Sequence, residues 1–134
     1  MADLPDIPDD LLALEERRMS ARRDLDLHVA TVEVGYRTAY PDPEQIVERR
    51  TWTPQETERW HELRAAYAAA AAAVLDHPLL VQAAADGRRW PVEEKLRSLV
   101  PRLQVVIRRN EPGSAERVVV LVDGAEELAA AQAA

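Results

Sequence analysis

The chain has 134 residues, which is the usual size of one domain. It is 47% hydrophobic and 31% charged, and its formal net charge is -7. It has no cysteine, which excludes disulfides, a cysteine-based zinc site, an iron–sulfur cluster and a cysteine nucleophile. The longest uncharged apolar run, residues 65–75, is too short and too alanine-rich to span a membrane. Asp3, Asp6, Asp9 and Asp10 stand where a secretory signal would carry positive charge, so we expect a soluble cytoplasmic protein.

The first long helix is predicted over residues 9–40, after a flexible lead-in of residues 1–8. Pro8 suits a first-turn position, and Asp9 and Asp10 complement the positive end of the helix dipole. Apolar residues then recur at spacings of three and four, which indicates one buried helix face. They are Leu11, Leu12, Leu14, Met19, Leu25, Val29, Val32, Tyr36 and Tyr40.

Residues 25–36 also fit a strand, because their apolar residues alternate with polar or small ones, and valine and threonine favour strands. We prefer the helix, since no turn residue separates this segment from the helical pattern before it. Both alternatives end at Gly35 and the Pro41-Asp42-Pro43 sequence. Residues 41–52 are then a connection with room for one short helical turn.

The second long helix is predicted over residues 53–86, with a kink near Pro78. The sequence Thr53-Pro54-Gln55-Glu56 fits a capping box, in which the threonine and the glutamate each bond the other's backbone amide. Trp60 and Tyr67 are seven residues apart and share one helix face, which indicates a buried face.

A shorter third helix is predicted over residues 90–100, a β-hairpin over residues 103–122 and a helical tail over residues 123–134. Residues 118–122 are apolar on both faces of their strand, so both faces need cover. A second copy of the chain or the helical tail would supply that cover. The predicted fold is mainly α: one domain, residues 1–134, with a long antiparallel helical hairpin, a short third helix and a C-terminal β-hairpin.

The sequence offers little for catalysis. Its four glycines are dispersed and its three serines lie outside any nucleophile motif, so we expect no enzyme and no cofactor. Glu58 and His61 form one E-x-x-H pair, whereas a di-iron bundle needs two such pairs and two further glutamates. We therefore interpret them as a solvated helix face and only a weak metal candidate.

The segment from Arg88 to Arg109 has seven basic and two acidic residues, a local charge of +5. A basic segment of this kind can follow a nucleic-acid backbone, for which the candidates are Arg88, Arg89, Arg108 and Arg109. We prefer an internal role, in which the segment balances the acidic N-terminal residues. Sixteen of the seventeen basic residues are arginine, which is typical of a GC-rich bacterial coding bias rather than of phosphate binding.

Our leading hypothesis is a small non-catalytic module that self-associates through apolar helix and strand faces. The partner would be a second copy in a homodimer, or another protein, with no membrane involved. The candidate contact residues are Val118, Val120, Val122, Trp60 and Tyr67. The alternative hypothesis is a nucleic-acid-associated accessory protein that uses the basic segment.

Overall fold

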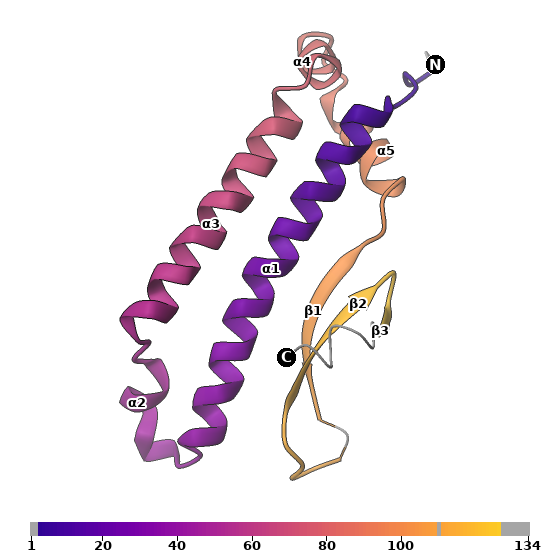
Figure 1. Cartoon of the computed structure of the whole chain (residues 1–134). Helices are drawn as coiled ribbons and strands as arrows, with labels where there is room; N and C mark the ends of the chain where they lie inside the picture. The colour runs from indigo at the N-terminus through magenta and orange to yellow at the C-terminus, as the bar shows by residue number, and fades with distance from the viewer. Residues whose placement is uncertain (1–2, 110, 127–134) are drawn as a thin grey trace.

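The structure is a computed structural model that describes residues 3–109 and 111–126. In this part of the chain, helices precede a three-stranded antiparallel sheet (Figure 1). The helices are α1 (Asp9–Ala39), the 3-10 turn η1 (Pro43–Gln45), α2 (Ile46–Arg50), α3 (Pro54–Leu75), α4 (Pro78–Ala85) and α5 (Arg89–Ser98). The strands are β1 (Leu103–Arg108), β2 (Arg117–Val122) and β3 (Ala125–Glu126). The predicted mainly α fold, with a long helical hairpin and a C-terminal β-hairpin, is confirmed.

Helix α1 runs without interruption through residues 25–36, so the strand alternative for this segment is wrong. The helix begins after Pro8, whose carbonyl oxygen accepts from the amides of Leu11 and Leu12 at 3.1 Å each. It is covered from two sides, by antiparallel α3 on one and by the sheet on the other (Figure 1). The two-sided cover explains why a segment rich in β-branched residues stays helical, since tertiary burial outweighs local propensity.

The start of α3 is fixed by the predicted capping box. The Thr53 hydroxyl accepts from the Glu56 amide at 3.1 Å, and the Glu56 carboxylate accepts from the Thr53 amide at 2.8 Å. The Tyr36 hydroxyl of α1 donates to the same carboxylate, and His28 Nε2 lies 2.9 Å from the Glu56 carbonyl oxygen. This junction therefore joins α1 to the first turn of α3.

The predicted second helix is divided into α3 and α4, which meet at a bend of 63°. Pro78 begins α4 and cannot donate a backbone hydrogen bond into α3. His77 caps α4: its Nδ1 accepts from the Leu79 amide at 3.1 Å, and its Nε2 lies 3.0 Å from the Asp10 carboxylate of α1. No single helix among the described residues is long and apolar enough to cross a bilayer, although α3 and bent α4 together reach that length and composition.

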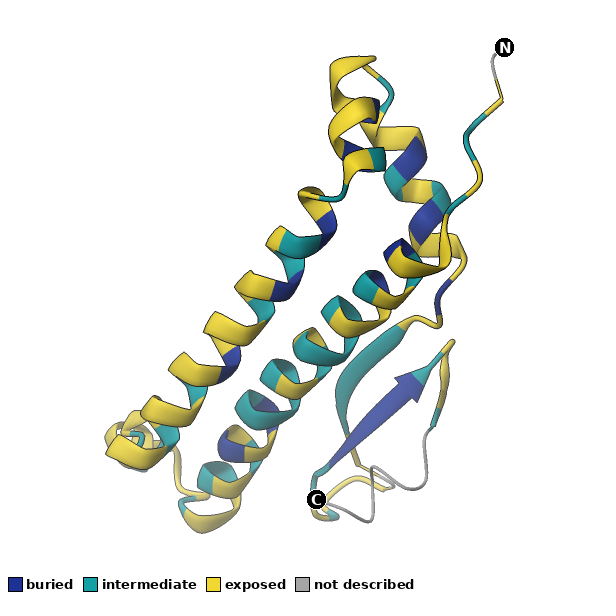
Figure 2. Ribbon diagram, turned by 45° about the horizontal axis from the view of Figure 1, so that its top comes forward, coloured by how far each residue is buried: buried dark blue, intermediate teal, exposed yellow. Residues whose placement is uncertain are grey.

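The main hydrophobic core lies where the N-terminal end of α1 meets α4, α5 and the C-terminal end of α3 (Figure 2). Its buried residues are Leu11, Val74, Leu80, Ala83, Val92 and Leu96. Leu4 and Ile7 pack against this cluster. Arg88 donates to the Asp3 carbonyl and Lys95 to the Pro5 carbonyl, each at 2.8 Å. Residues 3–8, expected to be a flexible lead-in, are therefore held against α5.

The sheet has the order β1-β2-β3, and the register of β1 with β2 pairs Leu103 with Val122. Asp123 and Gly124 have positive φ, 51° and 86°, and form a two-residue turn into β3. The sequence predicts a helical tail from residue 123 onward, and for residues 123–126 this prediction is wrong. They form a turn and a short strand, because an Asp-Gly pair favours a type I′ hairpin turn. The rest of the predicted tail, residues 127–134, lies outside the described residues.

Replacement of Leu96 by alanine should reduce the free energy of unfolding by about 2–5 kcal/mol, because the side chain is fully buried in the main core. Leu99→Ala removes the same atoms from a side chain that is 52% exposed, so its effect should stay below about 1 kcal/mol. Urea unfolding followed by circular dichroism measures both. Equal effects of the two variants would contradict the position of the core.

Replacement of Glu56 by glutamine should weaken the pH dependence of stability. The hydrogen bond from Tyr36, followed by that from the Thr53 amide, holds the pKa of Glu56 below its ordinary value of 4.5. A lowered pKa stabilises the fold above pH 4.5, and that contribution is lost as the pH falls through the folded pKa. The stability difference between wild type and Glu56→Gln should therefore shrink from pH 7 towards pH 3, as measured by thermal unfolding.

The matched control is Glu58→Gln, which removes a carboxylate from an exposed position on the same helix. Asp10 and Glu116 also have lowered pKa values, because of His77 and Arg37 respectively, so the variant keeps part of its acid sensitivity. A difference between wild type and Glu56→Gln that stays constant with pH would contradict the role of this junction.

Candidate interaction surface

The structure buries two of the predicted contact residues and leaves the other three half-buried on two separate elements. Val118 and Val120 of β2 are 8% and 0% exposed, and Val122 is half-buried. Trp60 and Tyr67 of α3 are half-buried. The apolar β2 strand therefore has cover within one chain, and the surface open to a second copy lies elsewhere.

Tyr67 forms part of a polar contact between α1 and α3. Its hydroxyl accepts from Arg18 at 3.3 Å, and the Arg22 guanidinium lies 5.4 Å from the centre of its ring. Arg18 Nε donates to both oxygens of Glu15, at 2.7 and 3.0 Å. Among the described residues, Glu15 is the one charged side chain that is buried, with 2% exposure. Sequence spacing did not single out this pair as a buried contact.

A pocket of about 230 Å³ lies beside this pair, between α1, α3 and α5. Glu93 on its wall pairs with Arg89 at 3.1 Å and with Arg97 at 3.7 Å. Glu15 and Arg18 line the opposite wall and pair with each other. Because every charged group of the pocket has a partner within the chain, we interpret it as a charged junction that joins the three helices.

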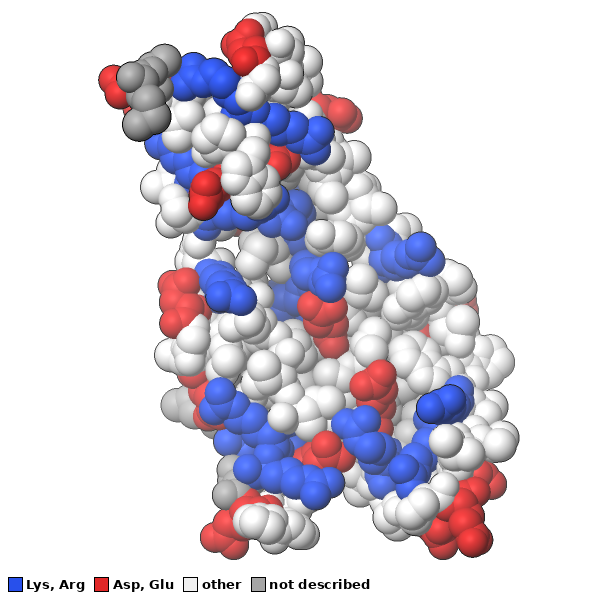
Figure 3. All heavy atoms as spheres, turned by 180° about the vertical axis from the view of Figure 1, so that it is seen from behind, with Lys and Arg blue, Asp and Glu red and all other residues white. Residues whose placement is uncertain are grey.

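The four arginines predicted to contact nucleic acid are divided between the two ends of the molecule. Arg88 and Arg89 lie at the start of α5, and Arg108 and Arg109 lie at the far end of β1 (Figure 1). Arg88 donates to a backbone carbonyl, Arg89 pairs with Glu93, and Arg108 lies 3.3 Å from a Glu126 oxygen. In Figure 3 acidic side chains lie between the basic ones on the face shown. The basic segment therefore forms no continuous strip, which favours the internal role.

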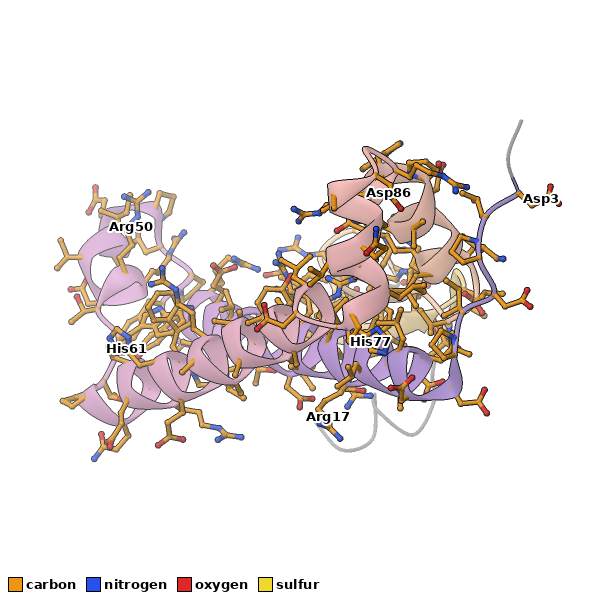
Figure 4. All side chains as sticks on the ribbon, turned by 90° about the horizontal axis from the view of Figure 1, so that it is seen from above. Asp3, Arg17, Arg50, His61, His77 and Asp86 are labelled. Carbon is orange, nitrogen blue, oxygen red and sulfur yellow. The ribbon has the colours of Figure 1, made fainter. Side chains whose placement is uncertain are left out.

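The metal candidates Glu58 and His61 are both exposed on α3. The ring of His61 lies edge-on to Trp60, with the ring centres 5.0 Å apart. Figure 4 shows His61 and His77 well separated along the molecule. Within the described ranges, no group of three or more histidine, aspartate or glutamate side chains is placed to hold a metal ion.

The outer edge of β1 is an open edge of the sheet among the described strands. This strand lies at one end of the sheet order and, among the described elements, contacts β2 and α1 alone. The amide of Asp123 donates to the carbonyl of Arg102 at 2.8 Å, which fixes the alternation of the ladder. The backbone N–H and C=O groups of residues 104, 106 and 108 therefore point towards β2. Those of Leu103, Val105 and Ile107 point towards the free edge.

The edge lacks the features that usually prevent pairing with another strand. Such features are lysine, proline, a bulge or a covering element. Between Leu103 and Ile107 the strand has four apolar residues and Gln104, all half-buried, and charge begins only at Arg102 and Arg108. Among the described residues, no hydrogen bond joins the outward backbone groups to another element. The edge is therefore the strongest candidate for contact with another chain.

Comparison with known proteins supplies no relative for this chain. It matches no protein-family model, no curated protein and no solved structure. A function must therefore be inferred from the arrangement of the chain's own residues.

Replacement of Arg18 by methionine should reduce the free energy of unfolding by about 3–5 kcal/mol, because it leaves the buried Glu15 carboxylate without its partner. The double variant Glu15→Leu/Arg18→Met removes both charges and should recover most of that loss. Urea unfolding at neutral pH measures the single and double variants. A double variant that is no more stable than Arg18→Met would contradict this assignment.

Proposed function

We propose that the protein is a cytoplasmic, non-catalytic module that self-associates by pairing β1 with β1 of a second copy. The observation that carries this proposal is the uncovered, apolar edge of β1, with three residues whose backbone groups point outward. An edge of this kind adds a strand from another chain, because main-chain hydrogen bonds and side-chain contacts then form together.

A two-fold axis at Val105 gives the pairing a definite register. Val105 faces Val105 of the second copy, and Leu103 faces Ile107 of the second copy. These three residues are the ones with free N–H and C=O groups, so the register satisfies all of them at once. The described strands of two copies would form one six-stranded antiparallel sheet.

The ends of the paired segment limit its length. Arg108 would face Arg102 of the second copy, and like charges directly opposite each other oppose pairing. Each cross-strand pair contributes about 0.2–1 kcal/mol, and each new hydrogen bond about 1 kcal/mol, against the entropic cost of association. The expected dimer is therefore weak and depends on concentration.

The net charge of -7 makes two copies repel each other, so added salt should strengthen the dimer by screening. Salt has the opposite effect on binding to nucleic acid, which weakens steeply as salt increases.

The test is sedimentation velocity across a range of concentrations. The wild type should move from 15.0 kDa towards twice that mass, and the shift should occur at lower concentration when salt is added. Val105→Pro should remain monomeric, because proline removes an outward N–H while leaving the ladder to β2 in place.

Val105→Thr is the matched control, because it changes the same side chain and keeps the backbone donor. It should associate like the wild type, and circular dichroism checks that both variants are folded. A wild type that stays at 15.0 kDa at all concentrations, or a folded Val105→Pro that dimerises equally well, would overturn the proposal.

A further inference from the structure

Two adjoining pockets lie at the end of the molecule where the C-terminal end of α1, α2 and the β1–β2 turn meet. One has a volume of about 370 Å³ and is lined by Glu33, Arg37, Arg49 and Arg50, with Trp52 beside them. The other, about 450 Å³, is lined by Arg37, Arg49, Arg109 and Glu116. We name these two pockets, which share Arg37 and Arg49, the arginine groove.

The charge of the arginine groove is opposite to that of the chain. Each pocket contains three arginines and one glutamate, a local charge of +2, whereas the whole chain has a charge of -7. Figure 3 shows two groups of basic side chains near this end of the molecule. A hollow whose lining has a net positive charge attracts anions.

Contacts within the chain hold the groove arginines in position. Arg37 donates to both carboxylate oxygens of Glu116, at 2.9 and 3.3 Å. Arg49 donates to the carbonyls of Tyr40 and Pro41, at 2.6 and 3.0 Å, where α1 ends. These bonds use some donors of each guanidinium and leave others free, because each guanidinium has five N–H groups.

Two acidic side chains already pair with Arg37 in the groove: Glu33 at 3.9 Å and Glu116 at 2.9 Å. Glu116 is 16% exposed and lies between Arg37 and Arg109, which is 3.7 Å away. The arrangement therefore binds a carboxylate within the chain. Arg50 has no side-chain partner among the described residues, so its donors are available beyond the reach of Glu116.

We propose that the arginine groove binds the phosphate group of a small organic phosphate. A phosphate monoester carries a charge of about -2 at neutral pH, which equals the local charge of the groove in magnitude. Guanidinium groups bind phosphate through paired hydrogen bonds, and the two volumes lie in the range of small-molecule sites. A long nucleic acid fits less well, because the chain as a whole repels a polyanion.

The test uses nuclear magnetic resonance of the arginine Nε–H and backbone amide signals. Inorganic phosphate, adenosine monophosphate and a single-stranded oligonucleotide are added separately, each against sodium chloride at the same ionic strength. Phosphate and the nucleotide should shift the signals of Arg49, Arg50 and Gly113, which also lines the second pocket, beyond the effect of chloride. No shift beyond that of chloride would overturn the proposal.

Three variants test whether the groove itself binds. Arg50→Gln should weaken phosphate binding by about fivefold or more, because it removes a charged donor. Glu116→Gln should strengthen it by about threefold or more, because it removes the competing negative charge. Arg17→Gln is the matched control: Arg17 is exposed on α1, away from Arg50 (Figure 4), and its loss should leave binding unchanged.

Other outcomes overturn the inference in distinct ways. If Arg17→Gln weakens binding as much as Arg50→Gln, the attraction is a property of overall charge. If the oligonucleotide alone binds, with a steep salt dependence, the groove is part of a nucleic-acid surface. Val105→Pro should bind phosphate like the wild type when both are monomeric, so a failure of the dimer proposal leaves this result unaffected.

Discussion

The fold depends on the burial of α1 from two sides. Among the described elements, α3 contacts α1 and α4, the sheet contacts α1, and α5 contacts α1 and α4. Helix α1 is therefore the common surface on which α2, α3, α5, β1 and β2 pack, and none of the described strands contacts α3. An amphipathic stripe that covers one face would not suffice for this role. The half-buried residues of α1 extend through most turns from Arg18 to Val29, which is the pattern expected of a helix with cover on both sides.

Polar contacts set the register of α1 against the helices that follow it. The contact between α1 and α3 contains many alanines. Their small side chains interlock little, so they do little to fix the position of one helix along the other. Asp10 meets His77, Arg18 meets Tyr67, and Tyr36 meets Glu56, so polar contacts occur near both ends of the hairpin and between them. Each of these hydrogen bonds requires one alignment of the two helices. The Glu15–Arg18 pair also helps to fix that alignment, because Glu15 holds the Arg18 guanidinium in place to donate to Tyr67 of α3.

Local patterns predicted the helices well and the contacts between them poorly. Pro8, the Thr53 capping box and Pro78 marked helix boundaries, because each changes the backbone hydrogen bonding of its own segment. The turn at Asp123 also had a local signal, since an Asp-Gly pair between apolar residues favours a hairpin over the helix cap that was predicted. Glu15 lies four residues after Leu11, so the two residues share the buried face of α1. This spacing was a local signal that Glu15 is buried. Its burial depends on Arg18 and Tyr67 meeting across two helices, which no local pattern contains.

Basic residues that are neighbours in the sequence are not the ones that gather in the structure. This regrouping connects the proposed dimer with the proposed phosphate site. The basic segment is split between the ends of the molecule, whereas Arg37, Arg49 and Arg109 come from three separate parts of the chain to one groove. Arg108 is the last residue of β1 and Arg109 follows it, so in the proposed dimer Arg102 of the second copy lies opposite Arg108, beside the groove. That arrangement adds positive charge where the proposed phosphate would bind. Because coupling between two binding events is reciprocal, an anion in the groove would favour the dimer as much as the dimer favours the anion.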